Sequence, residues 1–195
     1  MSGIFKYHIF VVPPREQYAF LEQETKGLAE PWLLGEGARL GDGFPSNARY
    51  PISKTKPGMK LADFIANKFG QLFVSGRARQ VLEREPVDIE WLPVVLLDKK
   101  DGVVDAPCFI ANVVGRVDCV DLAQSEYDRS SFEPDEFLAV RRLVLDVSRI
   151  PETASLFRIK EQPGTFIIRS DLVDRLADAG VKGFSLLELG APVFL

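Results

Sequence analysis

The sequence predicts an α+β fold in a single domain, with an antiparallel or mixed sheet on which two or more helices pack. Two observations predict this class. Short runs rich in β-branched and aromatic residues lie between Gly and Pro, and two serine-led segments have apolar residues at helical spacing. The chain has 195 residues, of which 46% are hydrophobic and 27% charged, as in one globular domain. We expect one unit over 1–195, with an N-terminal strand and a Gly/Pro-rich segment in 1–60 and the main αβ core in 61–195.

The N-terminal part predicts one strand followed by irregular chain. The run 7–12 is aromatic and β-branched and stops at two prolines, as a buried strand does. Residues 27–60 are so dense in Gly and Pro that we expect no regular structure there. They lack the Gly-Lys-Ser/Thr ending of a phosphate-binding loop. A small-molecule or regulatory binding module that uses segment 30–58 is an alternative function.

Residues 61–85 predict a helix, a strand and a second helix. The apolar residues of 61–66 indicate a short helix that ends near Gly70, and 72–74 is a short strand. Ser75 is a typical N-cap residue. The apolar residues that follow it lie at i, i+3 and i+4, so we expect a helix to about residue 85.

A hairpin follows. Apolar and acidic residues alternate over 87–91, which is typical of a half-buried strand, and the apolar run 94–97 continues it. Pro93 between them suggests a bulge or an edge position, because proline cannot donate to a ladder. Residues 98–102 have turn chemistry, and 108–114 is the returning strand.

The last third predicts three strands, a helix and a closing strand. The strands are expected at 142–147, 156–159 and 165–168. Ser170 is the expected N-cap of a helix over 171–179, and Gly180 is well placed for its C-terminus. Residues 184–189 predict a closing strand or extension.

The composition argues against most enzyme classes. One His and two Cys exclude a His- or Cys-rich zinc site, and no Gly-x-Ser-x-Gly element or calcium-binding loop is present. We expect His8 to be a core or sheet-face histidine with one hydrogen bond, and Cys108 and Cys119 to be reduced thiols. We expect no catalytic residue, metal or cofactor. The run 9–12 is too short for a signal-peptide core, and no apolar stretch approaches the roughly 18 residues of a membrane span. The predicted location is therefore the cytoplasm.

Charge is distributed unevenly along the chain. The net charge is −4, but segment 49–84 has eight basic and two acidic residues, whereas segment 121–136 has six acidic and one basic. The basic segment could contact nucleic acid, but a pI near 5.2 argues against a general nucleic-acid binder. We expect no nucleic-acid or membrane partner. The acidic segment is expected to be a solvated loop or a docking site for a charged partner.

The order of several short motifs resembles a family of bacterial immunity proteins from polymorphic-toxin and contact-dependent kin-discrimination systems. The motifs are Asp63-Phe64, Phe73-Val74-Ser75, Val81-Leu82, Ile89-Glu90-Trp91-x-Pro93-Val94, Ile110-Ala111-Asn112-Val113, Asp118-x-x-Asp121-x-x-x-Ser125, Leu143-Val144-Leu145, Leu156-Phe157-Arg158, Phe166-Ile167, Ser170-x-Leu172 and Gly180-x-x-Gly183-Phe184. The resemblance covers roughly residues 30–185. It implies a dedicated neutraliser of a toxin encoded beside it, with no catalysis and no cofactor. The matching positions are mostly apolar or capping residues, so none carries over as a functional residue.

Residues and resemblance together predict a non-catalytic immunity protein that binds and neutralises a cognate toxin. The acidic segment 121–136 suits a basic toxin such as a nuclease, since opposite charges speed association and fix specificity. The candidate contact residues are Glu126, Tyr127, Asp128, Phe132, Glu133, Asp135 and Glu136, with Tyr127 and Phe132 as exposed aromatic anchors. The binding module on 30–58 and an enzyme of unrecognised type are the alternatives, and the oligomeric state is open.

Overall fold

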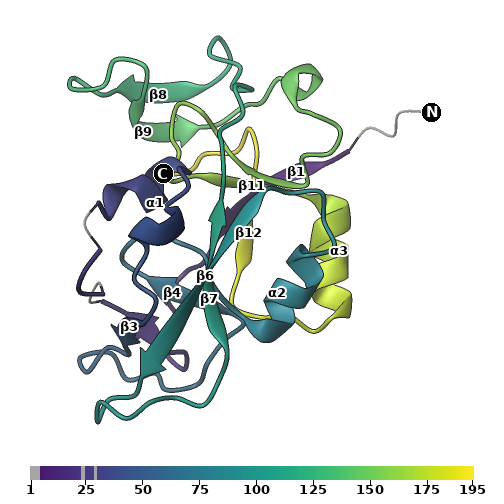
Figure 1. Cartoon of the computed structure of the whole chain (residues 1–195). Coiled ribbons are helices and arrows are strands. Elements are labelled where there is room, and N and C mark those ends of the chain that lie inside the picture. Colours follow the sequence, from purple (N-terminus) through teal and green to yellow (C-terminus); the bar gives the residue numbers. More distant parts are fainter. Residues whose placement is uncertain (1–4, 23–24, 29) are drawn as a thin grey trace.

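The computed structural model describes residues 5–22, 25–28 and 30–195, and in this part of the chain the strands form three sheets beside three short helices (Figure 1). One sheet has six strands, one has four, and the third is a two-stranded ribbon. Sheets with few helices make a mixed α+β or β-rich fold, which agrees with the predicted class.

The four-stranded sheet is antiparallel and has the N-terminal strand in its interior. Its order is β10, β11, β1, β12, spanning Leu156–Arg158, Phe166–Arg169, Tyr7–Val11 and Ser185–Glu188. Ile9 of β1 lies opposite Ile167 on one side and Leu187 on the other. The strands predicted from these four apolar runs are confirmed, with ends that differ by one or two residues.

The six-stranded sheet is mixed. Its order is β2, β4, β5, β7, β6, β3, spanning Phe20–Leu21, Phe64–Asn67, Phe73–Ser75, Cys108–Val113, Ile89–Leu97 and Ala48–Pro51. The predicted β6–β7 hairpin is confirmed. The single predicted sheet, built from this hairpin and the strands of the last third, is wrong, because β10 and β11 lie in the other large sheet. Pro93 lies one residue before β3 begins to pair with β6 at Val94, so β6 is an edge strand at that point, as predicted.

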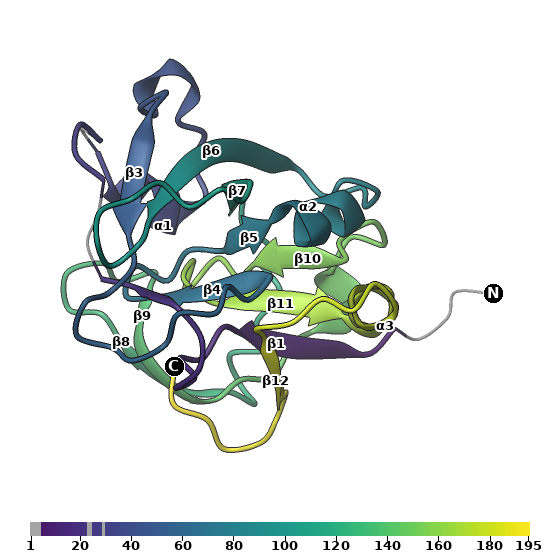
Figure 2. The same ribbon diagram turned by 90° about the horizontal axis from the view of Figure 1, so that it is seen from below.

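The two larger sheets face each other across a shared core (Figure 2). Phe64 and Val74 of the six-stranded sheet pack there with Phe10 and Ile168 of the four-stranded sheet. Alternate residues of the same strands point to two further cores on the outer faces of the sheets. Strands buried on both faces are apolar along their whole length, which is why their sequences are short continuous runs.

Two helices border this central core. They are α2 (Gly76–Leu82) and α3 (Ser170–Asp178), and Leu82 and Leu176 join the same cluster. The Ser75 cap is confirmed, because its Oγ accepts a hydrogen bond from the Ala78 N–H at 3.2 Å. The Ser170 cap is wrong.

At the start of α3 the N-cap residue is Arg169, whose side chain does not cap the helix. The Ser170 hydroxyl donates instead to the Lys6 carbonyl at 3.1 Å. The local sequence signal was outweighed by the residue just before β1, whose carbonyl is this acceptor.

Two other predicted elements are wrong for a related reason. Residues 61–66 are not helical, because Phe64 and Ile65 are buried on opposite faces of β4, which pairs with β5. Residues 142–147 are not a strand, because β9 (Phe137–Arg142) ends there and a 3₁₀ turn, η2 (Val147–Arg149), follows. In both places the spacing of the apolar residues correctly predicted which of them are buried, but it predicted the wrong secondary structure.

The Gly/Pro-rich segment also contains more regular structure than expected. Helix α1 (Trp32–Glu36), the 3₁₀ turn η1 (Gly41–Gly43) and strand β3 all fall within it. Leu34 of α1 and Tyr50 of β3 are almost fully buried and pack on the outer face of the six-stranded sheet. The segment therefore covers that face of the sheet.

Candidate functional site

The residues predicted to contact a toxin lie on a two-stranded ribbon beside the main sheets (Figure 1). We call it the acidic ribbon: β8 (Glu126–Arg129), β9 and the connecting tip at 130–136. The ribbon is antiparallel and has two irregularities in its register. The expected acidic loop is therefore partly strand.

The acidic ribbon is attached to the body of the protein through β9. Phe137 and Val140 are buried in the core on the outer face of the four-stranded sheet. The Phe137 N–H donates to the Glu161 carbonyl at 2.7 Å, and the Val193 N–H donates to the Arg141 carbonyl at 2.8 Å. The strands of the ribbon thus have a fixed place relative to the core.

Three of the predicted acidic residues form ion pairs with arginines. Glu126 pairs with Arg142 at 2.8 Å, and Asp128 pairs with Arg141 across the ribbon. At the end of the tip, Glu136 pairs with Arg116 at 2.9 Å, and the same guanidinium also pairs with Glu36 of α1. These three carboxylates are therefore largely neutralised within the chain.

Tyr127 is half-buried and is not the exposed anchor that we expected. Its ring stacks on Phe137 with 4.1 Å between centroids, and the Arg129 guanidinium lies over the Tyr127 ring, 5.4 Å from its centroid. Such contacts hold the two strands of a ribbon together. Tyr127 thus belongs to the support of the ribbon.

The tip has a different character. Phe132 is 91% exposed, and the carboxylates of Glu133 and Asp135 make no hydrogen bond or ion pair within the described residues. The backbone beneath them is held, because the Ser130 Oγ accepts from the N–H groups of Phe132 and Glu133. The tip therefore presents one apolar ring and two carboxylates without an ion pair on a hydrogen-bonded turn. Asp118 is the main cause that raises the pKa of Lys160, and Asp135 is a lesser cause, so a cation lies near Asp135.

A buried arginine connects α1 and β7 to the four-stranded sheet. Arg158 of β10 is 1% exposed and donates to four main-chain carbonyls: Val113 at 2.9 Å, Pro163 at 2.6 Å, Leu34 at 2.8 Å and Gly35 at 3.2 Å. Burial lowers its pKa to about 10, with Arg116 as a second cause, so it stays charged at neutral pH.

Gly37 makes room for this arginine. It follows α1 with a φ of 69°, and a Cβ at this position would lie 2.9 Å from the Arg158 side chain. The left-handed backbone and the close approach both require glycine. One of the glycines that made the segment look irregular is therefore part of the attachment of α1 to the sheets.

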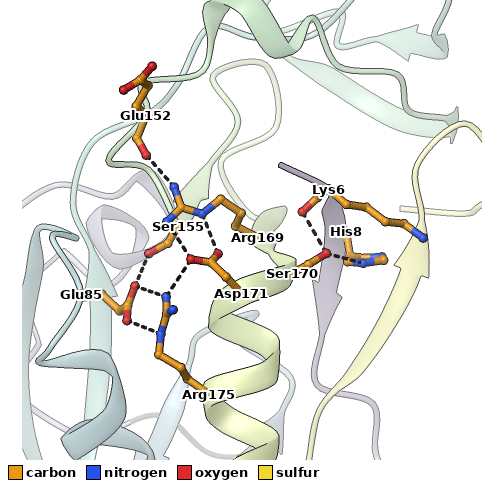
Figure 3. A network of polar contacts seen from close by, with 9 residues as sticks. All are labelled: Lys6, His8, Glu85, Glu152, Ser155, Arg169, Ser170, Asp171 and Arg175. Atoms are coloured by element: carbon orange, nitrogen blue, oxygen red, sulfur yellow. Dashed lines mark hydrogen bonds and ion pairs between the residues drawn. The ribbon is translucent and has the colours of Figure 1, made fainter. Parts of the chain in front are cut away.

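A polar network lies at the start of α3 (Figure 3). Asp171 accepts from Arg169 at 2.6 Å and from Arg175 at 3.1 Å, and Arg175 also pairs with Glu85 at 2.8 Å. The hydrogen bond from Arg169 is the main cause that lowers the pKa of Asp171 to about 2, and Arg175 adds to it. The network joins the end of α2 to α3 and β11.

The same corner brings His8 to a serine. Its Nε2 lies 3.3 Å from the Ser170 Oγ, whose own proton goes to the Lys6 carbonyl. While the hydroxyl donates to the Lys6 carbonyl, the contact with His8 uses the imidazole tautomer whose Nε2 carries the proton. Burial, with Lys6 nearby, lowers the pKa of His8. The pair fixes β1 against the start of α3.

Two searches of the described residues bear on the other predictions. Among residues 5–22, 25–28 and 30–195, no group of three or more His, Cys, Asp or Glu side chains is placed to hold a metal ion. Within the same ranges, every helix is too short or too polar to cross a bilayer. Cys108 and Cys119 are both free and buried, and burial raises the pKa of each thiol to about 12.

The match to a known family extends over nearly the whole fold. The model of the Immunity protein family (Imm11) matches residues 10–191. The chain belongs to this immunity protein family. Its resemblance to immunity proteins, first apparent in the order of the motifs, is thus confirmed, and membership indicates a toxin-neutralising role through a toxin partner. A search of curated proteins finds no match.

The matched range includes the acidic ribbon, the Arg158 attachment and the α3 network. Sequence reasoning found the acidic residues of the ribbon but missed their arginine partners. The adjacent Arg141 and Arg142 were the available signal, because two arginines on the strand that follows an acidic strand favour cross-strand pairs. Arg116 and Arg158 gave no comparable signal, since most of their partners lie far away in the sequence.

Proposed function

We propose that this chain is a non-catalytic immunity protein that neutralises a cognate toxin by binding it directly in the bacterial cytoplasm. The toxin would belong to a polymorphic-toxin or contact-dependent kin-discrimination system. Membership of the immunity protein family supports the general role.

The tip of the acidic ribbon is the proposed contact. The observation that carries this proposal is the exposed Phe132 ring beside two carboxylates, Glu133 and Asp135, that form no hydrogen bond or ion pair in the described chain. An exposed aromatic residue provides an anchor, and unpaired charges steer and select an oppositely charged partner. The toxin surface would therefore be basic, as that of a nuclease is near its phosphate-binding site.

The remaining predicted residues take a supporting role in this proposal. Glu126 and Asp128 pair with the arginines of β9, Glu136 is bound to Arg116, and Tyr127 stacks beneath the ribbon. Their charges are already compensated, so they would contribute less to attraction than Glu133 and Asp135. They position the tip.

The test reverses the two free charges. In Glu133→Lys/Asp135→Lys, association with the toxin domain encoded by the neighbouring gene should slow by about tenfold or more at low salt, because steering is lost. Stopped-flow or surface-plasmon kinetics at several salt concentrations measure this effect. The wild-type rate should fall steeply as salt rises, and the rate of the variant should not.

The matched control is Asp174→Lys/Asp178→Lys on α3. Both residues are exposed and make no hydrogen bond or ion pair in the part of the chain that the structure describes, and α3 lies away from the ribbon (Figure 1). This variant has the same change in net charge, so its association should slow far less. Equal rates in the two double variants would place the contact outside the tip, and the basic segment 49–84 would be examined next.

A further inference from the structure

A cavity of about 500 Å³ lies beside β3, at the opposite end of the protein from the acidic ribbon (Figure 1). It is lined by Glu22, Thr25, Lys26, Asn47, Arg49, Pro51, Ile52, Ser53, Lys54, Thr55, Leu97 and Asp101. Its size is within the range of cavities that bind small organic molecules. None of the residues proposed to contact a toxin lines it.

The ionic groups in this cavity do not all have partners. Lys54 pairs with Asp101 at 2.9 Å, and Glu22 accepts a hydrogen bond from Thr55 at 3.0 Å. Within the described residues, Lys26 and Arg49 are left without an ion pair or a side-chain hydrogen bond. Lys26 and Arg49 thus outnumber Glu22, the one carboxylate of the lining that has no ion pair in the described chain.

The position of Arg49 is fixed by its main chain. Arg49 lies in β3 opposite Val95 of β6, and its N–H donates to the Thr25 Oγ1 at 2.9 Å. The strand thus fixes where the side chain starts, and the planar guanidinium donors match carboxylate and phosphate oxygens.

The remaining lining residues indicate what the uncharged part of a ligand would contact. Pro51, Ile52 and Leu97 supply apolar surface, and the Asn47 side chain makes no hydrogen bond within the described residues. No aromatic ring lines the cavity. The walls therefore suit an aliphatic or sugar body, and they lack the stacking surface that a base would use.

We propose that this cavity binds a small organic anion, with a phosphate or carboxylate group held by Arg49 and Lys26. The body of the anion would contact Ile52 and Leu97, and Asn47 would bind a polar group on it. This site is separate from toxin neutralisation. It corresponds to the alternative of a binding module in segment 30–58, because residues between 47 and 55 line the cavity, whereas the four glycines at 35–43 do not.

Isothermal titration calorimetry of the whole chain with glucose 6-phosphate, citrate and inorganic phosphate tests the proposal. At least one organic probe should bind with a dissociation constant below about 1 mM and more tightly than inorganic phosphate, because it also contacts the apolar wall. Arg49→Ala should weaken that binding by about tenfold or more, the effect of losing a charge-assisted hydrogen bond. The amide NMR signals of residues 47–55 should shift as the probe is added.

Arg84→Ala is the matched control. Arg84 is exposed, makes no ion pair or side-chain hydrogen bond in the described chain and does not line the cavity, so its loss changes net charge alone. Binding by this variant should remain within about twofold of the wild type. The proposal is overturned if no organic probe binds at millimolar concentration, or if Arg49→Ala and Arg84→Ala weaken binding equally. Neither result would bear on toxin binding, because the tip has its own test.

Discussion

Arg158 and the tip of the acidic ribbon are two charged regions that the chain treats in opposite ways. Arg158 is buried, and its guanidinium donates to four main-chain carbonyls from three separate parts of the sequence. Glu133 and Asp135 are exposed and have no such partner among the described residues. The first charge organises the interior, whereas the other two are available to another molecule.

The energetic cost of burying a charge explains why we interpret Arg158 and the carboxylates of the tip differently. A buried charge is tolerated only when hydrogen bonds replace its lost hydration, so Arg158 must be read as part of the fold. A hydrated surface carboxylate costs almost nothing and contributes almost nothing to stability. The free charges at the tip therefore have no structural explanation, and this is why we assign them to binding.

The largest expected effect is at Arg158. Arg158→Met keeps the apolar stem but removes the donors, which leaves four buried carbonyls without their partner. We expect it to lower the free energy of unfolding by roughly 3–5 kcal/mol, measured by chemical denaturation. Arg158→Lys keeps the charge but cannot reach all four carbonyls, so its loss should be intermediate.

Arg84→Met is the surface counterpart of this change, and it should alter the free energy of unfolding by less than about 0.5 kcal/mol. The comparison between interior and tip fails if Arg158→Met and Arg84→Met have the same denaturation midpoint. In that case water or neighbouring side chains would replace the guanidinium, and burial would not identify a structural charge in this protein.

Local signals predicted the fold well where one segment determines its own structure. The Ser75 cap and the β6–β7 hairpin follow from residues that are close together in the sequence. The Ser170 cap failed because the hydroxyl found an acceptor in Lys6, 164 residues away. Residues 61–66 failed because partners in β5 and the two cores made a strand of an apolar run that has helical spacing.

The candidate site, too, could be predicted from the sequence only in part. The composition of 121–136 located the acidic residues, and the exposed Phe132 was found in the sequence alone. Which carboxylates are free depends on arginines at 116, 141 and 142, and these partners become visible only when the ribbon and α1 are in place. Sequence reasoning therefore gave the segment, and the ion pairs of its other carboxylates are the reason why we propose the tip as the contact.

An intermediate effect is expected in the α3 network, where a charge is half-buried and paired. The pKa of Asp171 is about 2 in the folded protein, below its value of 3.8 as a free side chain. Its contribution to stability is therefore complete above about pH 5 and is lost as the pH falls through 4 toward 2. The Asp171 side chain is 36% exposed, so after allowance for solvent screening we expect a contribution of about 1 kcal/mol.

Asp171→Asn isolates this contribution from that of the other carboxylates. Denaturation curves at pH 7 should show the variant less stable than the wild type by about 1 kcal/mol, and the two proteins should converge near pH 2. If the two proteins differ in their free energy of unfolding by the same amount at pH 7 and at pH 2, the loss comes from altered packing or hydrogen bonding and not from the charge of Asp171.

The smallest effect on stability is expected at the tip, together with a large effect on binding. Phe132→Ala removes a ring that is 91% exposed, so the free energy of unfolding should change by less than about 0.5 kcal/mol. If the ring is an anchor, toxin dissociation should accelerate by about tenfold or more, because hot-spot residues act mainly on the dissociation rate. Met59→Ala is the control, since Met59 is 68% exposed and lies outside the acidic ribbon; it should change neither quantity. A Phe132→Ala protein that unfolds as the wild type does and also releases its toxin at the wild-type rate would show that exposure at the tip carries no function.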